Sequence, residues 1–326
     1  MKRKCLALLA CLFSLSAPSF AQQPIKLALG HGAAPDTPRH EACLRFAEII
    51  KQKTGGRYEV NVAPSFQLGN NAAMLTSLRA GTMALSANGQ GPTAVIIPEF
   101  SAIGLPFLFS SSEKAWKLID GPIGKELAEK TAAKGIVMLG FWDNGIRHMT
   151  NSKHPIRTPA DVKGLKFRIS GDPMVLSIVQ ALGASGQDIK FSEIYAALKQ
   201  GEVDGQENPL SNIASAKFYE VQPYLSLTGH TYSVMPFMMS KRYWDRMSSS
   251  DQKIFQEAAN EITQMQRKLS KDADDKLLAE LKAKGMKVDT IDRAQFMTAT
   301  KPVYDQWLAS PIGDFVKRVI EASKQQ

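Results

Sequence analysis

The chain has 326 residues, 44% of them hydrophobic, and a net charge of +9 at pH 7. This length exceeds the ~250–300 residues that a single hydrophobic core usually organises, so we expect two lobes. The basic residues are spread along the chain without forming a Lys/Arg run, which argues against a nucleic-acid partner and suits a protein whose ligand is an anion.

An export signal is expected at the N-terminus. Three basic residues among the first four are followed by an apolar run over residues 5–15, and Ser19 and Ala21 occupy the two small positions before a cleavage site. The apolar run is shorter than the ~20 residues that span a bilayer, which argues against a membrane anchor. We therefore predict a signal peptide at residues 1–21, cleaved after Ala21.

Two of the three cysteines, Cys5 and Cys11, lie within the predicted signal peptide. Lipidation at Cys11 is an alternative, because the four residues that end there resemble a lipoprotein cleavage box. After cleavage only Cys43 remains, so no intramolecular disulfide is expected. We interpret Cys43 as a small core residue on the apolar face of a helix rather than as a nucleophile, although His40 precedes it by one helical turn.

Strands and helices alternate in the first part of the predicted mature chain. The pattern predicts a strand at 25–29, a helix from about Pro38 to Lys53, a strand at 58–62 and a helix that ends at Gly81. This order is typical of an α/β sheet with crossover connections.

The loops that follow these strands are candidates for a ligand site. In an α/β sheet, the loops beyond the carboxyl ends of the strands form the ligand crevice. The loops at His31, at Asn70 and at Asn88 to Gln90 would therefore converge on one cleft.

From Gly135 onward the alternation repeats and predicts a second α/β lobe. The expected elements are strands at 136–141, 165–169 and 232–240, a helix at 173–182 and a short helix at 192–199. A second lobe built in this way requires the chain to cross between the lobes more than once.

A long amphipathic helix is predicted at about residues 250–284. Ser250 caps it, Gly285 ends it, and apolar residues recur between them at every third or fourth position. A helix of about 35 residues is ~50 Å long, which is longer than one lobe, so we expect it to span both lobes. The apolar stripe does not keep a strict seven-residue period, which argues against a coiled coil.

Signatures of catalysis are missing from the sequence. It contains no His-Glu-x-x-His, no Gly-x-Ser-x-Gly, no phosphate loop and no Cys-x-x-Cys, and its five histidines do not pair at metal-ligand spacing. We therefore expect no catalytic residue, no metal and no cofactor, with an enzyme that acts on acids as the minor alternative.

Two arginines are candidate anion-binding residues. Arg168 lies inside the predicted strand at 165–169, where a buried charge is unfavourable unless an anion meets it. Its guanidinium can make two parallel hydrogen bonds to a carboxylate. Arg147 ends the polar segment Asn144–Arg147 after another predicted strand. An exposed arginine on an edge strand is the alternative interpretation of Arg168.

Several ordered stretches of the chain carry a family resemblance. They are Phe191–Leu198 and Val203–Pro209, supported by Pro64–Gly69, Leu105–Phe107, Gly145–Asn151, Lys163–Ile169 and Lys217–Gln222. With these stretches in this order, nearly the whole predicted mature chain resembles the DctP-type solute-binding proteins of tripartite ATP-independent periplasmic (TRAP) transporters.

The resemblance implies an α/β, two-lobe fold like that of type II periplasmic binding proteins, with the long C-terminal helix spanning both lobes. Lobe I would comprise residues 22–144 with about 232–265, and lobe II residues 145–231 with about 266–326. It also implies a receptor in the periplasm that closes on a small organic acid and docks on the membrane permease subunits of the transporter. A sensor role, with a membrane kinase as the partner, is the alternative.

The resemblance also implies roles for individual residues. It assigns the principal salt bridge with the ligand carboxylate to Arg168, a second polar contact to Arg147 and a hydrogen bond to Asn208. Further candidate ligand-binding residues are His31, Asn70 and Asp172 at the edge of the cleft, and Phe191 and Trp142 as apolar walls.

The loop at Asn88 to Gln90 bears on the class of ligand. Where sialic-acid receptors of the family that this chain resembles carry a glutamate and an arginine, this chain has Gly89 and Pro92. The amides of Asn88 and Gln90 can donate and accept hydrogen bonds, which suits hydroxyl groups. We therefore favour a hydroxylated monocarboxylate such as a uronate or an aldonate. A C4-dicarboxylate or a 2-oxo acid is the alternative, and a dicarboxylate would need a second cation, such as Arg147 or His31.

Overall fold

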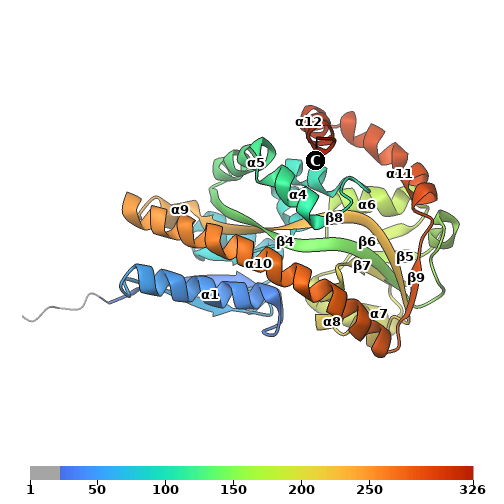
Figure 1. The fold of residues 1–326 in the computed structure, drawn as a ribbon, viewed down its shortest axis with the longest axis horizontal. Coiled ribbons are helices and arrows are strands. Elements are labelled where there is room, and N and C mark those ends of the chain that lie inside the picture. Colours follow the sequence, from blue (N-terminus) through green and yellow to red (C-terminus); the bar gives the residue numbers. More distant parts are fainter. Residues whose placement is uncertain (1–22, 326) are drawn as a thin grey trace, which may run out of the picture.

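One mixed β-sheet runs through the molecule, and helices cover both of its faces (Figure 1). The structure is a computed structural model that describes residues 23–325. The predicted signal peptide at residues 1–21 lies outside the described residues. Within them, no helix combines the length and the apolar character that a membrane span requires.

The sheet combines two groups of parallel strands with a central antiparallel pair. Its strands are β1 (Ile25–His31), β2 (Tyr58–Ala63), β3 (Leu85–Ala87), β4 (Ile136–Asn151), β5 (Lys166–Ile169), β6 (Ser185–Asp188), β7 (Gly205–Asn208), β8 (Tyr224–Ser240) and β9 (Lys287–Thr290). They lie in the order β2-β1-β3-β8-β4-β7-β5-β6, with β9 beside β8. β2, β1 and β3 are parallel at one end, β7, β5 and β6 are parallel at the other, and β8 and β4 are antiparallel between them.

Most of the helices lie in the connections between these strands, and the last two follow β9. They are α1 (Pro38–Lys53), α2 (Asn71–Ala80), α3 (Gln90–Ile96), α4 (Ser112–Ile119), α5 (Pro122–Ala133), α6 (Pro173–Ala181), α7 (Ile194–Gln200), α8 (Leu210–Ser215), α9 (Lys241–Trp244), α10 (Ser249–Ala283), α11 (Arg293–Leu308) and α12 (Gly313–Ser323). Short 3₁₀ helices are η1 (Pro98–Gly104), η2 (Pro159–Val162), η3 (Phe191–Glu193) and η4 (Phe218–Glu220). α1, α5 and α6 have proline in the first turn, where its missing N–H leaves no intrahelical bond unmade.

The two long strands β4 and β8 connect the ends of the sheet, and the sequence predicted only part of each. The predictions covered 136–141 and 232–240, whereas the strands have 16 and 17 residues. The register of the β4–β8 pair shifts at three irregularities, one of them between Asp143 and Gly145. Gly145 has a φ of 115°, which disfavours other residues. Arg147 therefore lies on β4 itself rather than after the strand, where the sequence had predicted it.

Buried apolar side chains form separate clusters on the two faces of the sheet. On one face, α1 and the first half of α10 bury Phe46, Phe237 and Phe255 against the sheet, and Trp142 belongs to this cluster. On the same side, as Figure 1 shows, α7 and α8 meet the far end of α10. Helices α2, α4, α5, α6, α11 and α12 cover the other face. The neighbours Phe141 and Trp142 belong to opposite clusters, as alternation along a strand requires.

The long helix α10 was predicted almost residue for residue. It has 35 residues, begins at Ser249 after the N-cap Ser248, and lies along one face of the molecule from α1 to α8 (Figure 1). The side chain of Gln266 accepts a hydrogen bond from the N–H of Asp143 and donates one to its carbonyl. Arg267 donates to the carbonyl of Phe141. Two consecutive side chains of α10 thus hold the middle of β4.

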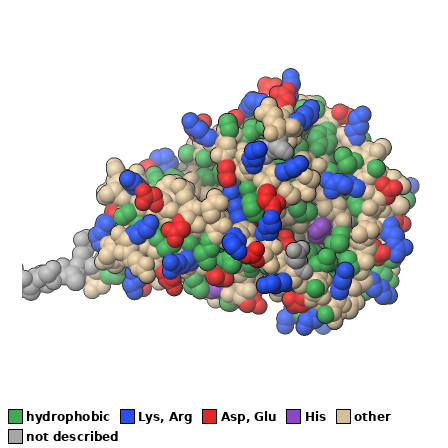
Figure 2. Space-filling view, in the orientation of Figure 1, with side chains coloured by type: hydrophobic (Ala, Val, Ile, Leu, Met, Phe, Trp, Pro, Cys, Tyr) green, Lys and Arg blue, Asp and Glu red, His purple; other side chains and the backbone are tan. Residues whose placement is uncertain are grey.

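Charged side chains are mixed on the surface. On the face drawn in Figure 2, basic and acidic side chains alternate rather than gather by sign. This face therefore has no single basic patch of the kind that a nucleic acid backbone attracts.

Candidate functional site

A cavity of about 340 Å³ lies between the two groups of parallel strands. Loops after β1 and β3 line it from one end of the sheet, and residues at or near the ends of β5 and β7, together with η3 and α8, line it from the other. β4 and β8 contribute residues from their middle parts. Residues far apart in the sequence therefore meet here, because both groups of strands direct their carboxyl-end loops towards the centre of the sheet.

Arg168 is the buried cation of this cavity. It lies on β5, is 3% exposed, and its Nε donates a hydrogen bond to the carbonyl of Ile189 at 2.8 Å. Among residues 23–325 no carboxylate lies within ion-pair distance of its guanidinium. Burial lowers the pKa of Arg168 to about 10, so it stays charged at neutral pH. A buried charge without a partner is unfavourable, and an anionic ligand in the cavity would compensate it.

Arg147 lines the same cavity but already has a partner. Its guanidinium forms a two-pronged ion pair with the carboxylate of Glu207 and also donates to the Glu207 carbonyl at 2.6 Å. Although burial opposes it, the charge of Arg147 holds the pKa of Glu207 at about 2. One further guanidinium nitrogen of Arg147 donates to Ser233 Oγ at 3.2 Å. Arg147 therefore adds hydrogen-bond donors to the cavity but little net charge.

Asn208, the last residue of β7, also lines the cavity. Its Nδ2 donates to Gln206 Oε1, and its Oδ1 accepts hydrogen bonds from Arg147 and from Asn212 Nδ2. The amide is thus oriented by its neighbours before a ligand arrives, which reduces the entropy cost of binding.

Three more of the predicted residues lie in the lining. Asp172 caps α6 by accepting from the N–H of Met174, and burial raises the pKa of its carboxyl to about 6. Gln90 Oε1 accepts from the N–H of Val234 at 3.0 Å. Phe191 forms an apolar wall with Phe66, whose ring centre lies 6.0 Å away.

Two predicted residues, His31 on β1 and Trp142 on β4, do not line the cavity. His31 is fully buried beneath it, where its Nδ1 accepts from the N–H of Ala33 and its Nε2 lies 3.0 Å from His40 Nδ1. Burial and the nearby Arg39 lower the pKa of His31 to about 3, so it is neutral and cannot serve as a second cation. Trp142 is buried in the core, stacked on Phe237 with ring centres 4.4 Å apart.

Two asparagines occupy the expected loops but point elsewhere. Asn70 caps α2 by accepting from the N–H of Ala73 at 2.9 Å. Asn88 is buried, donates to the carbonyl of Asn71 and accepts from the N–H of Gly89. In each loop an adjacent residue, Asn71 or Gly89, lines the cavity instead. The expected loops do converge on the cavity, which Asn71 and Gly89 line in place of Asn70 and Asn88.

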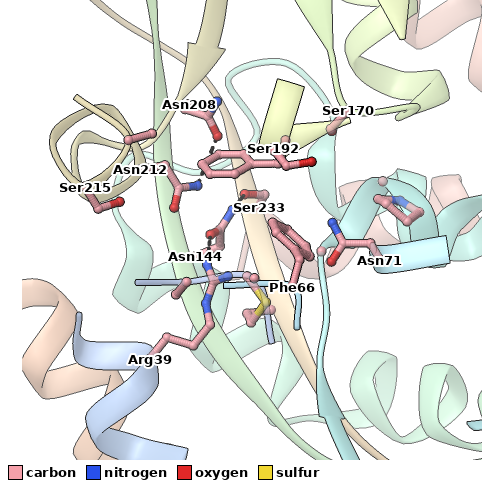
Figure 3. A pocket seen from close by; sticks show the side chains of 18 of the residues that line it. Arg39, Phe66, Asn71, Asn144, Ser170, Ser192, Asn208, Asn212, Ser215 and Ser233 are labelled. Atoms are coloured by element: carbon pink, nitrogen blue, oxygen red, sulfur yellow. Dashed lines mark hydrogen bonds between the residues drawn. The ribbon is translucent and has the colours of Figure 1, made fainter. Parts of the chain in front are cut away.

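Sequence reasoning missed most of the hydroxyl and amide groups of the lining, and a third arginine. The labelled side chains in Figure 3 that were not predicted are Arg39, Phe66, Asn71, Asn144, Ser170, Ser192, Asn212, Ser215 and Ser233. Arg39 lies in the first turn of α1, and its Nη2 donates to Asn144 Oδ1 at 3.0 Å. Because Arg39 directly follows the loop after the first strand, its position in the sequence could have indicated that it lines the cavity.

Taken together, the lining offers guanidinium, amide and hydroxyl groups. Such groups bind an anion that also carries hydroxyls. Among residues 23–325, no three side chains of the metal-binding types are arranged to hold a metal ion. A cavity between the two ends of an α/β sheet, with a guanidinium that no described carboxylate pairs, is suited to binding a small anion.

Comparison with known proteins identifies the family. Residues 29–310 match DctP, the bacterial extracellular solute-binding protein family 7, and the chain belongs to this family. The protein y4mM of Sinorhizobium fredii is 49% identical over 280 residues, which are 86% of this chain and 52% of that protein. The chain therefore spans about half the length of this relative.

Two solved structures share the fold. The sugar acid binding protein DctPAm from Advenella mimigardefordensis, in complex with galactonate, is 35% identical, with a TM-score of 0.90 over 93% of this chain and 99% of that one. A TRAP periplasmic solute-binding protein from Polaromonas, bound to D-erythronate, is 36% identical, with a TM-score of 0.88 over 90% and 98% of the two chains. The predicted fold class and family are thus confirmed.

Proposed function

We propose that this protein is the periplasmic receptor of a TRAP transporter and captures a sugar acid by its carboxylate, without chemical change to the ligand. One observation carries the proposal: Arg168 is buried in the cavity with no carboxylate partner among the described residues. A carboxylate in front of Arg168 would accept two parallel hydrogen bonds and offset the cost of the buried charge.

The rest of the ligand is expected to carry hydroxyl groups. The lining around Arg168 is rich in amides and hydroxyls, among them Asn208, Asn212, Ser170 and Ser233. Galactonate and D-erythronate, the ligands of the two solved structures, are both hydroxylated monocarboxylates. This supports a sugar acid ahead of a simple C4-dicarboxylate or a 2-oxo acid.

Binding would close two lobes around the ligand. Lobe I would comprise residues 22–144 with about 232–265, and lobe II residues 145–231 with about 266–326. The two halves are connected by β4, β8 and the shared helix α10, so a change in these elements can move one group of parallel strands relative to the other. A ligand that contacts both groups stabilises the closed form because only that form offers all contacts.

The location follows from the same proposal. Cleavage after Ala21 would release the receptor into the periplasm, where the loaded, closed form docks on the membrane permease subunits. Export is supported by the basic and apolar pattern of residues 1–21 and by the family to which the chain belongs.

The test is a thermal-shift screen of the purified mature protein against sugar acids, hydroxy acids, dicarboxylates and 2-oxo acids. A ligand that binds the native state stabilises it by about 2.7 kcal/mol at one hundred times its Kd. We expect a large rise in Tm with sugar acids and none with the matched neutral alditols. The same samples in small-angle scattering should show a smaller radius of gyration with the acid that raises Tm. If no acid shifts Tm, the proposed function is wrong.

A further inference from the structure

The cavity contains a second arginine without a carboxylate partner. Arg39 reaches it from the first turn of α1, and its one side-chain hydrogen bond among the described residues goes to the neutral Asn144. No carboxylate of residues 23–325 lies within ion-pair distance of it. Burial lowers the pKa of Arg39 to about 10, so it too is charged at neutral pH.

Two of the arginines in the lining, Arg39 and Arg168, form no ion pair with the side chains that the structure describes. Three arginines line the cavity, and Glu207 neutralises only Arg147. Asp172 is the one carboxylate among the lining residues; it caps α6 and forms no ion pair with Arg39 or Arg168. A ligand with a single carboxylate would compensate Arg168 and leave Arg39 without a counter-charge.

The two arginines without an ion-pair partner come from elements of opposite halves of the sheet. In Figure 3, Arg39 and Asn144 lie at one end, whereas Asn208 and Ser170 lie at the other. Arg168 lies on β5, two residues before Ser170, whereas Arg39 lies on α1, which packs beside β2 in the other group of parallel strands. Between the ends lie Ser233 and the apolar ring of Phe66, as Figure 3 shows.

The side chain of Arg39 is held in place by a chain of hydrogen bonds. Asn144 Oδ1 accepts from Arg39, and Asn144 Nδ2 donates to Ser233 Oγ at 2.7 Å. Ser233 Oγ also accepts from Arg147. This chain connects α1 to β4 and β8, so the guanidinium is oriented towards the cavity without a ligand.

We propose that Arg39 binds a second anionic group, so that the preferred ligand is a hydroxylated dicarboxylate of the sugar-diacid (aldarate) class. One carboxylate would lie at Arg168, the hydroxyls along the amides and serines, and the distal carboxylate at Arg39. This inference rests on the proposed function, since it assumes that an acid occupies the same cavity. It differs from the prediction of a monocarboxylate, which followed from the uncharged loop at Asn88 to Gln90, because the second cation is Arg39 of α1 and not a residue of that loop.

The experiment compares galactarate with galactonate, which differ only in whether the distal carbon is a carboxylate or a primary alcohol. We expect titration calorimetry of the wild type to give an affinity for galactarate at least about tenfold higher, as for a charge-assisted bond. Arg39→Gln, which keeps a hydrogen-bond donor but removes the charge, should reduce this ratio to about one by weakening galactarate alone. Arg45→Gln is the matched control on the exposed side of α1 and should keep the wild-type ratio.

The possible failures are distinguishable. If neither acid, nor any other in the screen, binds the wild type, the proposed function fails and this inference fails with it. If the wild type binds galactonate as tightly as galactarate, or if Arg39→Gln keeps the wild-type ratio, only the second anionic site is wrong. A melting curve of each variant identifies a loss of affinity that comes from unfolding.

Discussion

At the scale of single residues, the arginines of the cavity differ in whether a carboxylate of the protein pairs with their charge. Arg147 and Glu207 form a buried ion pair, so a ligand gains little by approaching either charge. The guanidinium of Arg168 makes one hydrogen bond to the part of the chain that the structure describes, to the carbonyl of Ile189. An anionic ligand therefore gains more free energy at Arg168 than at Arg147.

Arg168→Ala should reduce sugar-acid binding below detection while the protein still folds. Truncating one partner of a buried charge pair costs about 2–5 kcal/mol of binding free energy, most of it from the unpaired carboxylate. The fold should tolerate the change because the removed charge has no protein carboxylate to leave behind. Calorimetry with the acid identified in the screen measures the loss, and an unchanged Kd would contradict the assignment.

Asn208→Ala provides the comparison. Its amide contributes neutral hydrogen bonds, so we expect a weaker effect, about 1–3 kcal/mol. A loss as large as that of Arg168→Ala would mean that Asn208 acts mainly by holding Arg147, which donates to its Oδ1 at 3.2 Å.

The site residues predicted from the sequence form two groups: those in stretches with a family resemblance, and those chosen only from their position in a strand or helix. Arg168, Arg147 and Asn208 belong to stretches with a family resemblance, and all three line the cavity. His31 and Asn70 were chosen because they end strands or begin helices. Such a position fixes the loop but not the direction of the side chain, which here satisfies backbone groups instead.

At the scale of elements, the sequence predicted an element well where its apolar residues recur at a regular spacing, and missed part of an element where that spacing is interrupted. The apolar stripe of α10 placed the helix within one residue of both its ends, Ser249 and Ala283. The second half of β4 was missed because Asp143 to Gly145 has the composition of a turn. In the structure, the backbone N–H of Asp143 donates to Gln266 of α10 instead. The register of β4 against β8 shifts between Asp143 and Gly145, so the strand continues past this segment.

Asn70→Ala tests the role of Asn70 as the N-cap of α2. Asn70 begins α2 but does not line the cavity, so the substitution should lower stability by about 0.5–2 kcal/mol without changing ligand affinity. Urea denaturation and calorimetry measure the two effects. The neighbour Asn71, whose side chain lines the cavity, is the matched comparison: Asn71→Ala should lower affinity. A loss of affinity in Asn70→Ala with unchanged stability would restore Asn70 to the site.

At the scale of the whole molecule, buried titratable groups link stability to pH. Burial, assisted by neighbouring charges, lowers the pKa values of His31 and His148 to about 3, below their ordinary 6.5. Below pH 6.5 the unfolded chain therefore binds two protons that the native state excludes. Asp172 acts in the opposite direction, because its raised pKa of about 6 lets the native state bind one proton between pH 6 and its ordinary 3.8.

The balance predicts that stability falls as the pH decreases below 6.5. For these three groups, the unfolded state holds about one proton more than the native state from pH 6 to 4.5, which corresponds to a loss of about 1.4 kcal/mol per pH unit. Below 4.5 the loss should steepen, because the pKa of Glu207 is lowered to about 2 and its unfolded form takes up a proton first. Urea denaturation at pH 4.5 to 8 measures the slope. His31→Gln, which can still accept from the N–H of Ala33, removes one of the two protons and should flatten the slope between pH 6 and 4.5. A variant that loses stability with acid as steeply as the wild type would show that His31 is not one of the groups that couple folding to pH.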